Sequence, residues 1–174
     1  MIERPRPGEI GDYYFRYIDR VPRGEDVLKV IEAQRDSTGA LLRGIGEEQS
    51  RKRYAPGKWS IRQVLGHVTD TELLFLFRAF WFARGFDSPL PSFDENPAAE
   101  RQRADDVSWA SLVDAFDAAR SATIGFFRNL PADASPRSGV ASGNPFTVRA
   151  LAFVIAGHVS HHEAVLRERY LTPP

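Results

Sequence analysis

In this 174-residue sequence, the spacing of the histidines is the pattern most typical of a functional site. His67 lies in the stretch W-S-I-R-Q-V-L-G-H-V-T-D-T-E, and His158, His161 and His162 lie in A-G-H-V-S-H-H-E near the C-terminus. Side chains four residues apart share one helix face, so the imidazoles of His158 and His162 can reach one ion. His161 lies about 100° around the helix from His162 and is the second choice. The spacing predicts a metal site on the last helix.

The alternative is that these histidines are core residues, each with an ordinary hydrogen bond. His158 and His162 occupy positions of the apolar stripe that also carries Val148, Leu151 and Ile155. Burying several imidazoles without a partner is costly, which favours a ligand role. Spacing alone does not connect His67 to the pair, so both interpretations stay open at this point.

The composition restricts the chemistry further. The chain has no cysteine, so a metal must be held by imidazole and oxygen, and histidine ligands favour zinc or nickel. The 23 basic and 23 acidic residues cancel, which argues against a broad nucleic-acid surface. The N-terminus has no apolar core of signal-peptide length, and the apolar patch from Leu73 to Ala83 is too short for a bilayer. We expect a cytoplasmic protein without nucleic-acid or membrane partners.

Periodic apolar residues predict four helices that position the histidines, at about 25–48, 60–84, 107–129 and 147–170. Ser60 and Gln63 match a capping box at the start of the second helix. A proline- and tyrosine-rich arm, residues 1–23, is expected to cover the core. A long crossover loop joins the second and third helices, and its F-D-E-N run either hangs over the site or packs on the bundle. We find no convincing strand, and interpret 133–145 as a loop. The fold class is all-α, one domain over 1–174 built as a four-helix bundle.

The end of the second helix is apolar nearly all round. Such a helix end is either deeply buried or shared with a second subunit. We favour a homodimer contact that uses some of Phe77, Phe80, Trp81 and Phe82.

Two carboxylates, Asp70 and Glu72, follow His67 closely in the sequence. Glu72 falls about 140° around the helix from His67 and is a poor direct ligand. Asp70, Glu72 or Glu163 could instead orient an imidazole. Glu72 could also simply pair with a buried arginine such as Arg78 or Arg120. Catalytic roles for Glu72 and Asp70 are therefore hypotheses.

The two histidine segments, together with Y-A-P-G-K-W-S, R-G-F-D-S-P-L-P-S-F-D-E-N and L-R-E-R-Y-L, resemble the DinB/YfiT-like superfamily over about residues 13–171. The resemblance implies a four-helix bundle of unusual connectivity, often a homodimer, with a divalent metal held by three histidines. Matched by position, these ligands are His67, His158 and His162, whereas His161 matches a neighbour that is not usually a ligand.

The activities of the superfamily differ, so the resemblance supports the site better than the reaction. Some members resemble thiol-dependent S-transferases, some are maleylpyruvate isomerases, and others have been named metal-dependent hydrolases. We expect a metal-dependent enzyme acting on a small molecule, either an S-transferase that uses a low-molecular-weight thiol or a hydrolase in which Glu72 or Asp70 relays a proton. The alternatives are a non-catalytic metal- or small-ligand-binding protein and a helical dimerisation module with vestigial histidines.

Overall fold

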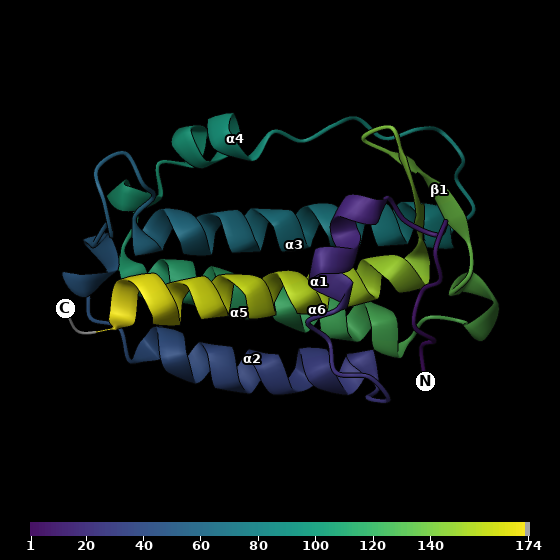
Figure 1. The fold of residues 1–174 in the computed structure, drawn as a ribbon, viewed down its shortest axis with the longest axis horizontal. Coiled ribbons are helices and arrows are strands. Elements are labelled where there is room, and N and C mark those ends of the chain that lie inside the picture. The colour runs from purple at the N-terminus through teal and green to yellow at the C-terminus, as the bar shows by residue number, and fades with distance from the viewer. Residues whose placement is uncertain (173–174) are drawn as a thin grey trace.

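A computed structural model describes residues 1–172 and shows a four-helix bundle (Figure 1). Its long helices are α2 (Val27–Arg43), α3 (Ile61–Ala83), α5 (Trp109–Arg128) and α6 (Val148–Val165). A π-helical turn, Leu166–Leu171, continues α6 to the end of the described chain. The all-α prediction is confirmed, and each of the four expected helices forms within its predicted range.

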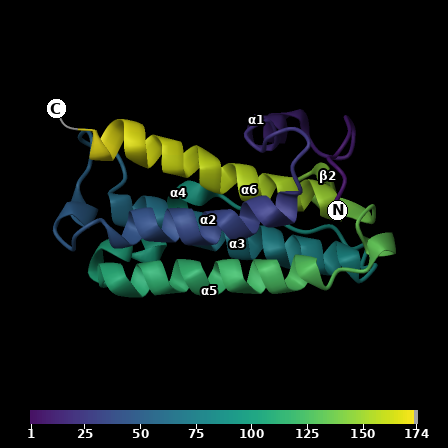
Figure 2. The same cartoon turned by 90° about the horizontal axis from the view of Figure 1, so that it is seen from below.

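The bundle does not follow the simple up-and-down order. Both α2 and α3 make their main helix contacts with α5 and α6 (Figure 2). The helices therefore follow one another around the bundle as α2, α5, α3 and α6. Helices α2 and α3 stand at opposite corners, as do α5 and α6. Helix α3 therefore lies directly against α6, and these are the two helices that carry histidine.

Side-chain caps fix where these helices begin. Ser60 accepts a hydrogen bond from the backbone N–H of Gln63, and the Gln63 side chain accepts one from the Ser60 N–H, which confirms the predicted capping box. At the starts of α2, α5 and α6, the side chains of Asp26, Ser108 and Thr147 each accept one backbone hydrogen bond. These caps set the register of each helix and so the direction in which its side chains point.

The crossover between α3 and α5 contains a helix that the sequence analysis described as loop. Helix α4 (Glu95–Gln102) begins at Asp94, whose carboxylate accepts from the Asn96 N–H, and it packs along α3 (Figure 1). The Gln102 side chain sits so close to α3 that a Cβ at Gly66 would lie 1.8 Å from its Oε1. The crossover is therefore held over α3 rather than looping freely away from it.

The predicted loop 133–145 and the statement that no strand is present were wrong. Strands β1 (Ser138–Ala141) and β2 (Asn144–Thr147) form an antiparallel hairpin. Its two turn residues, Ser142 and Gly143, have φ values of 51° and 71°, the left-handed conformation that tight two-residue hairpins require. The second strand runs directly into α6, so the hairpin fixes the start of that helix.

The N-terminal arm lies across the bundle as predicted. Its short helix α1 (Phe15–Ile18) packs on α6 at a glycine (Figure 2). A Cβ at Gly157 would lie 1.9 Å from the carbonyl oxygen of Tyr17. Only glycine allows the two backbones to approach this closely, and the approach brings Tyr17 next to the histidines of α6.

The apolar end of α3 divides between core and surface. Phe82 is buried in the core and is not available for a subunit contact, whereas the expected contact through some of Phe77, Phe80 and Trp81 stays a prediction. Phe77 and Phe80 are 46% and 39% exposed. Among residues 1–172, no helix combines the length and the apolarity that crossing a bilayer requires.

Candidate metal centre

Three imidazoles from two helices converge on one point. His67 Nε2 on α3 lies 3.2 Å from His158 Nε2 on α6, and His162 Nε2 lies 3.1 Å from the same atom. The three ligand atoms all lie within 4.8 Å of one another. The contact between α3 and α6 thus joins His67 to the i, i+4 pair, which spacing alone did not do.

The surroundings hold these rings in place. His67 and His158 are 9% and 5% exposed. The hydroxyl of Thr71, one turn after His67, lies 3.4 Å from His67 Nδ1, and the Trp59 ring centroid lies 5.1 Å from that of His67. Tyr17 of the arm stands edge-on to His158, with ring centroids 5.3 Å apart. The cluster is therefore packed on several sides by groups from different parts of the chain.

Burial keeps the three imidazoles neutral. Burial first, and then the neighbouring imidazoles, lower the pKa of His67 to about 4 and that of His162 to about 2. The pKa of His158 is lowered well below its ordinary value for the same reasons. At neutral pH each ring therefore has a lone pair, which is the form that binds a metal.

The arrangement fits a divalent ion. Ligand atoms about 2.1 Å from a tetrahedral ion lie roughly 3.4 Å apart, close to the two Nε2–Nε2 distances observed here. Hydrogen bonding alone does not satisfy this buried cluster, because His158 Nε2 faces two other Nε2 atoms and a neutral imidazole nitrogen offers only one proton or one lone pair. Three imidazoles also leave coordination positions for water or substrate, which is typical of catalytic sites.

His161 stands beside the cluster and is not one of its three members. Its ring centroid lies 5.6 Å from that of Tyr17 and 4.9 Å from that of His162, and the residue is half-buried. The preference for His158 and His162 over His161 therefore agrees with the geometry.

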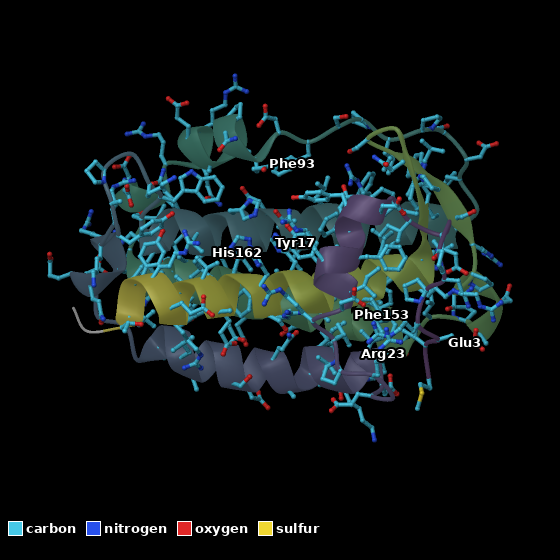
Figure 3. All side chains as sticks on the ribbon, in the orientation of Figure 1. Glu3, Tyr17, Arg23, Phe93, Phe153 and His162 are labelled. Carbon is cyan, nitrogen blue, oxygen red and sulfur yellow. The ribbon has the colours of Figure 1, made fainter. Side chains whose placement is uncertain are left out.

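A cavity of about 100 Å³ opens beside His67 and His158. Its walls come from the arm, α3, the crossover and the hairpin turn, and comprise Tyr13, Tyr14, Tyr17, His67, Thr71, Leu74, Phe75, Arg78, Phe93, Glu95, Ser142 and His158. Figure 3 shows from which segments Tyr17, Phe93 and His162 project. Of the two alternatives for the F-D-E-N run, the structure selects the one in which it hangs over the site.

Part of this cavity is not predicted by the sequence pattern. The arm tyrosines are expected only to cover the core, yet Tyr14 and Tyr17 also line the cavity, and Arg78 joins them there without having been predicted. The available signal was the position of Arg78, eleven residues and about three helical turns after His67 on one helix face.

The predicted carboxylates lie outside the cavity walls. Glu72 is 2% exposed, and its Oε2 lies 3.4 Å from Nε of Arg120 on α5, so it pairs with that arginine rather than with Arg78. Burial raises the pKa of Glu72 against the attraction of Arg120. Burial likewise raises the pKa of half-buried Asp70.

Glu163 points toward α2 rather than toward an imidazole. Its Oε2 accepts a hydrogen bond of 2.7 Å from Thr38, and Arg167 Nε donates one of 3.0 Å to its Oε1. These partners give Glu163 a role in joining α6 to α2.

Two curated relatives match parts of the chain. A protein of Oceanobacillus iheyensis named "Putative metal-dependent hydrolase" is 32% identical over 69 residues, covering 39% of this chain and 39% of the relative. A protein of Geobacillus thermodenitrificans with the same name is 28% identical over 96 residues, covering 53% of this chain and 48% of the relative. The matched regions span less than half the length of either relative.

Solved structures share the fold at low sequence identity. YfiT from Bacillus subtilis, described as "a probable metal-dependent hydrolase with an unusual four-helix bundle topology", aligns with a TM-score of 0.69 and 17% identity over 95% of this chain and 90% of YfiT. A mycothiol-dependent maleylpyruvate isomerase aligns with a TM-score of 0.69 and 14% identity over 84% of this chain and 61% of the isomerase. The family model of the DinB superfamily matches residues 31–166, a range that includes all three clustered histidines, and the chain belongs to this superfamily.

Proposed function

We propose that the protein is a metal-dependent enzyme in which His67, His158 and His162 hold one divalent ion. The observation that carries this proposal is the convergence of three neutral Nε2 atoms, 3.1 and 3.2 Å apart, at the wall of a cavity. Zinc and nickel both suit a set of imidazole ligands. A bound ion of this kind supplies Lewis acidity and lowers the pKa of a coordinated water or thiol.

Hydrolysis is the reaction type that we favour. Both curated relatives carry the name of a metal-dependent hydrolase, and the cavity beside His67 and His158 gives a substrate a place next to the proposed ion. Asp70 and Glu72 remain our candidates for proton relay. Glu95 joins them, because it is the one carboxylate among the described cavity walls.

Thiol-dependent transfer is the second candidate. The chain has no cysteine, so a reactive thiolate would have to come from a bound low-molecular-weight thiol. The shared fold with a mycothiol-dependent isomerase favours testing this chemistry. In both reactions the same three imidazoles would hold the metal, and the same cavity would hold the small-molecule substrate.

The first test is the metal content of protein purified without a histidine tag. We expect close to one zinc or nickel ion per chain in the wild type, measured by mass spectrometry of the elements, and none in the His67→Ala/His158→Ala/His162→Ala variant. An equal metal content in the two proteins would contradict the proposed site.

The second test is turnover. Ester and amide substrates test hydrolysis, and electrophiles supplied with a panel of low-molecular-weight thiols test transfer. The Asp70→Asn, Glu72→Gln and Glu95→Gln variants, each with its metal content measured, then identify the proton relay. Stoichiometric metal without turnover of any substrate would favour the alternative, a non-catalytic metal-binding protein.

A further inference from the structure

Arg78 differs from the other buried arginines of this protein. Arg62, Arg78 and Arg120 are all fully buried. Arg62 pairs with Glu47 and Arg120 with Glu72. No aspartate or glutamate within residues 1–172 forms an ion pair with Arg78. Its guanidinium therefore carries a buried positive charge without a counterion among the described residues.

The partners that Arg78 does have are neutral. Nη2 donates to the carbonyl oxygen of Pro91 at 3.1 Å and to Oγ of Ser142 at 2.9 Å. The guanidinium lies 5.8 Å from the Phe75 ring centroid and 5.6 Å from that of Phe146. Nε is buried and has no hydrogen-bond partner in the part of the chain that the structure describes. These contacts hold the side chain in position and leave its charge uncompensated.

An uncompensated buried charge is costly, and an arginine does not escape that cost by losing its proton. Burial lowers the pKa of Arg78, but a guanidinium remains charged at neutral pH. Such a residue gains most from an anion that enters its surroundings, because charge-assisted hydrogen bonds are strong where water is excluded.

The position of Arg78 shows where such an anion would lie. Arg78 lines the same cavity as His67 and His158. On α3 it lies eleven residues after His67, toward the C-terminal end of the helix. Thr71, on the same helix between His67 and Arg78, also lines the cavity. Glu95 is the one carboxylate among the described cavity walls, and it is exposed, so solvent screens its repulsion of an anion.

We propose that Arg78 forms an anion-binding subsite, and that the molecule taken up by this cavity carries a carboxylate that binds Arg78 while its other end faces the histidine cluster. A planar carboxylate matches the donor geometry of a guanidinium, and Ser142 stands next to it as a further hydrogen-bonding group. This inference rests on the proposed function, since it assigns the substrate class of the same cavity.

Butyrate and its neutral counterpart butyramide are suitable probes, because they differ in charge and little in size. We would titrate each into untagged protein of known metal content and measure affinity by NMR or calorimetry. Wild-type protein is expected to bind butyrate more tightly than butyramide. Arg78→Gln is expected to weaken butyrate binding by about tenfold or more and to leave butyramide binding nearly unchanged. The butyrate affinity of Arg78→Lys should lie between those of the wild type and Arg78→Gln, because lysine keeps the charge and loses the planar donor pair.

Arg84→Gln is the matched control. Arg84 follows α3 by one residue, is exposed, and has its guanidinium over the Phe80 ring rather than in the cavity. This variant should bind butyrate as the wild type does. Equal butyrate affinity in Arg78→Gln and wild type would overturn the proposal. Equal affinity of the wild type for butyrate and butyramide would overturn it as well, even if the variant did not fold.

A carboxylate can also bind a metal, so the titrations are repeated after treatment with EDTA. The effect of Arg78→Gln should persist in the metal-free protein. An effect confined to the metal-loaded form would place the carboxylate on the metal and overturn the subsite. Conversely, stoichiometric metal without any Arg78 effect would leave the proposed metal enzyme standing, so the two failures are distinguishable.

Discussion

At the scale of single residues, adjacent histidines are expected to behave differently. His162 Nε2 lies 3.1 Å from His158 Nε2, whereas His161 contacts Tyr17 at the edge of the cluster. We therefore expect His162→Ala to lose most of the bound metal and His161→Ala to keep close to one ion per chain. Elemental analysis of the two variants, purified side by side without a tag, checks this. Equal metal loss in both would mean that His161 is also a ligand.

The sequence predicted the clustered histidines, but it did not predict the position of Arg78. Helical spacing alone paired His158 with His162. The resemblance to a family added His67, because its members share histidine at the positions of the metal ligands. The proposed role of Arg78 depends on the fact that no aspartate or glutamate among residues 1–172 forms an ion pair with it. That absence is set by the packing of the crossover, the hairpin and the aromatic rings, none of which appears in a local pattern.

At the scale of elements, the contact between α1 and α6 decides whether the arm can close the cavity. A Cβ at Gly157 would lie 1.9 Å from the Tyr17 carbonyl oxygen. We expect Gly157→Ala to force the two backbones apart and to lower the free energy of unfolding by roughly 1–3 kcal/mol. For a chain of this size that corresponds to a fall in Tm of about 2–4 °C per kcal/mol, measurable by thermal unfolding.

Gly125→Ala on α5 is the control for that substitution. Apart from the neighbouring backbone of its own helix, no atom of residues 1–172 lies within 4 Å of a Cβ at Gly125, so alanine fits there without displacement. Alanine also favours the helical state over glycine by up to about 1 kcal/mol. Gly125→Ala should therefore keep or raise Tm. A Gly157→Ala protein as stable as this control would show that the close approach of α1 to α6 does not constrain the arm.

A second link ties the arm to the start of α6, and its contribution should depend on pH. Arg149 Nε donates to Glu9 Oε2 at 2.6 Å, and this hydrogen bond is the main reason that the pKa of Glu9 is lowered from its ordinary value of 4.5. A carboxyl whose pKa is lower in the folded state stabilises that state above its unfolded pKa. The contribution is lost as pH falls through the folded pKa.

We therefore expect Glu9→Gln to cost roughly 1–2 kcal/mol of unfolding free energy at pH 7, since a charge-assisted hydrogen bond is lost. The difference between variant and wild type should shrink as pH falls below the ordinary Glu9 pKa of 4.5. Urea unfolding at a series of pH values measures both quantities. A difference that stayed constant from pH 7 to pH 3 would contradict the ion-pair explanation.

The elements that sequence reasoning predicted are those fixed by local chemistry. Ser60 and Gln63 satisfy backbone groups within four residues of each other, so the capping box is visible in the sequence. The hairpin left only a short signal, the Ser142–Gly143 turn, because its strands gain stability from pairing rather than from periodic apolar residues. Helix α4 is polar and short, and its contact with α3 through Gln102 is not visible in a helical stripe.

At the scale of the whole molecule, the helix order explains why the histidines meet. Because α2 and α3 stand at opposite corners, α3 is free to lie against α6, far from it in sequence. The arm and the crossover then cover the side on which the cluster opens, and both contribute to the cavity walls. Sequence patterns predicted that four helices would pack together. Which of them are neighbours follows from tertiary contacts, and only the family resemblance indicated an unusual order.

We propose that the exposed aromatic face of α3 forms a homodimer contact. Leu73, Phe77 and Phe80 are 48%, 46% and 39% exposed and lie on one side of the helix, and Phe86 beyond it is 47% exposed. Aromatic side chains gathered on a surface are typical of subunit contacts.

We expect wild-type protein to be dimeric and Phe77→Asp to be monomeric, because a two-fold contact would bury two carboxylates in an apolar interface. Light scattering after size exclusion measures this, with Val140→Asp, at an exposed position on the hairpin, as a control that stays dimeric. A monomeric wild type, or a Phe77→Asp dimer as stable as the control, would leave this face without the proposed role.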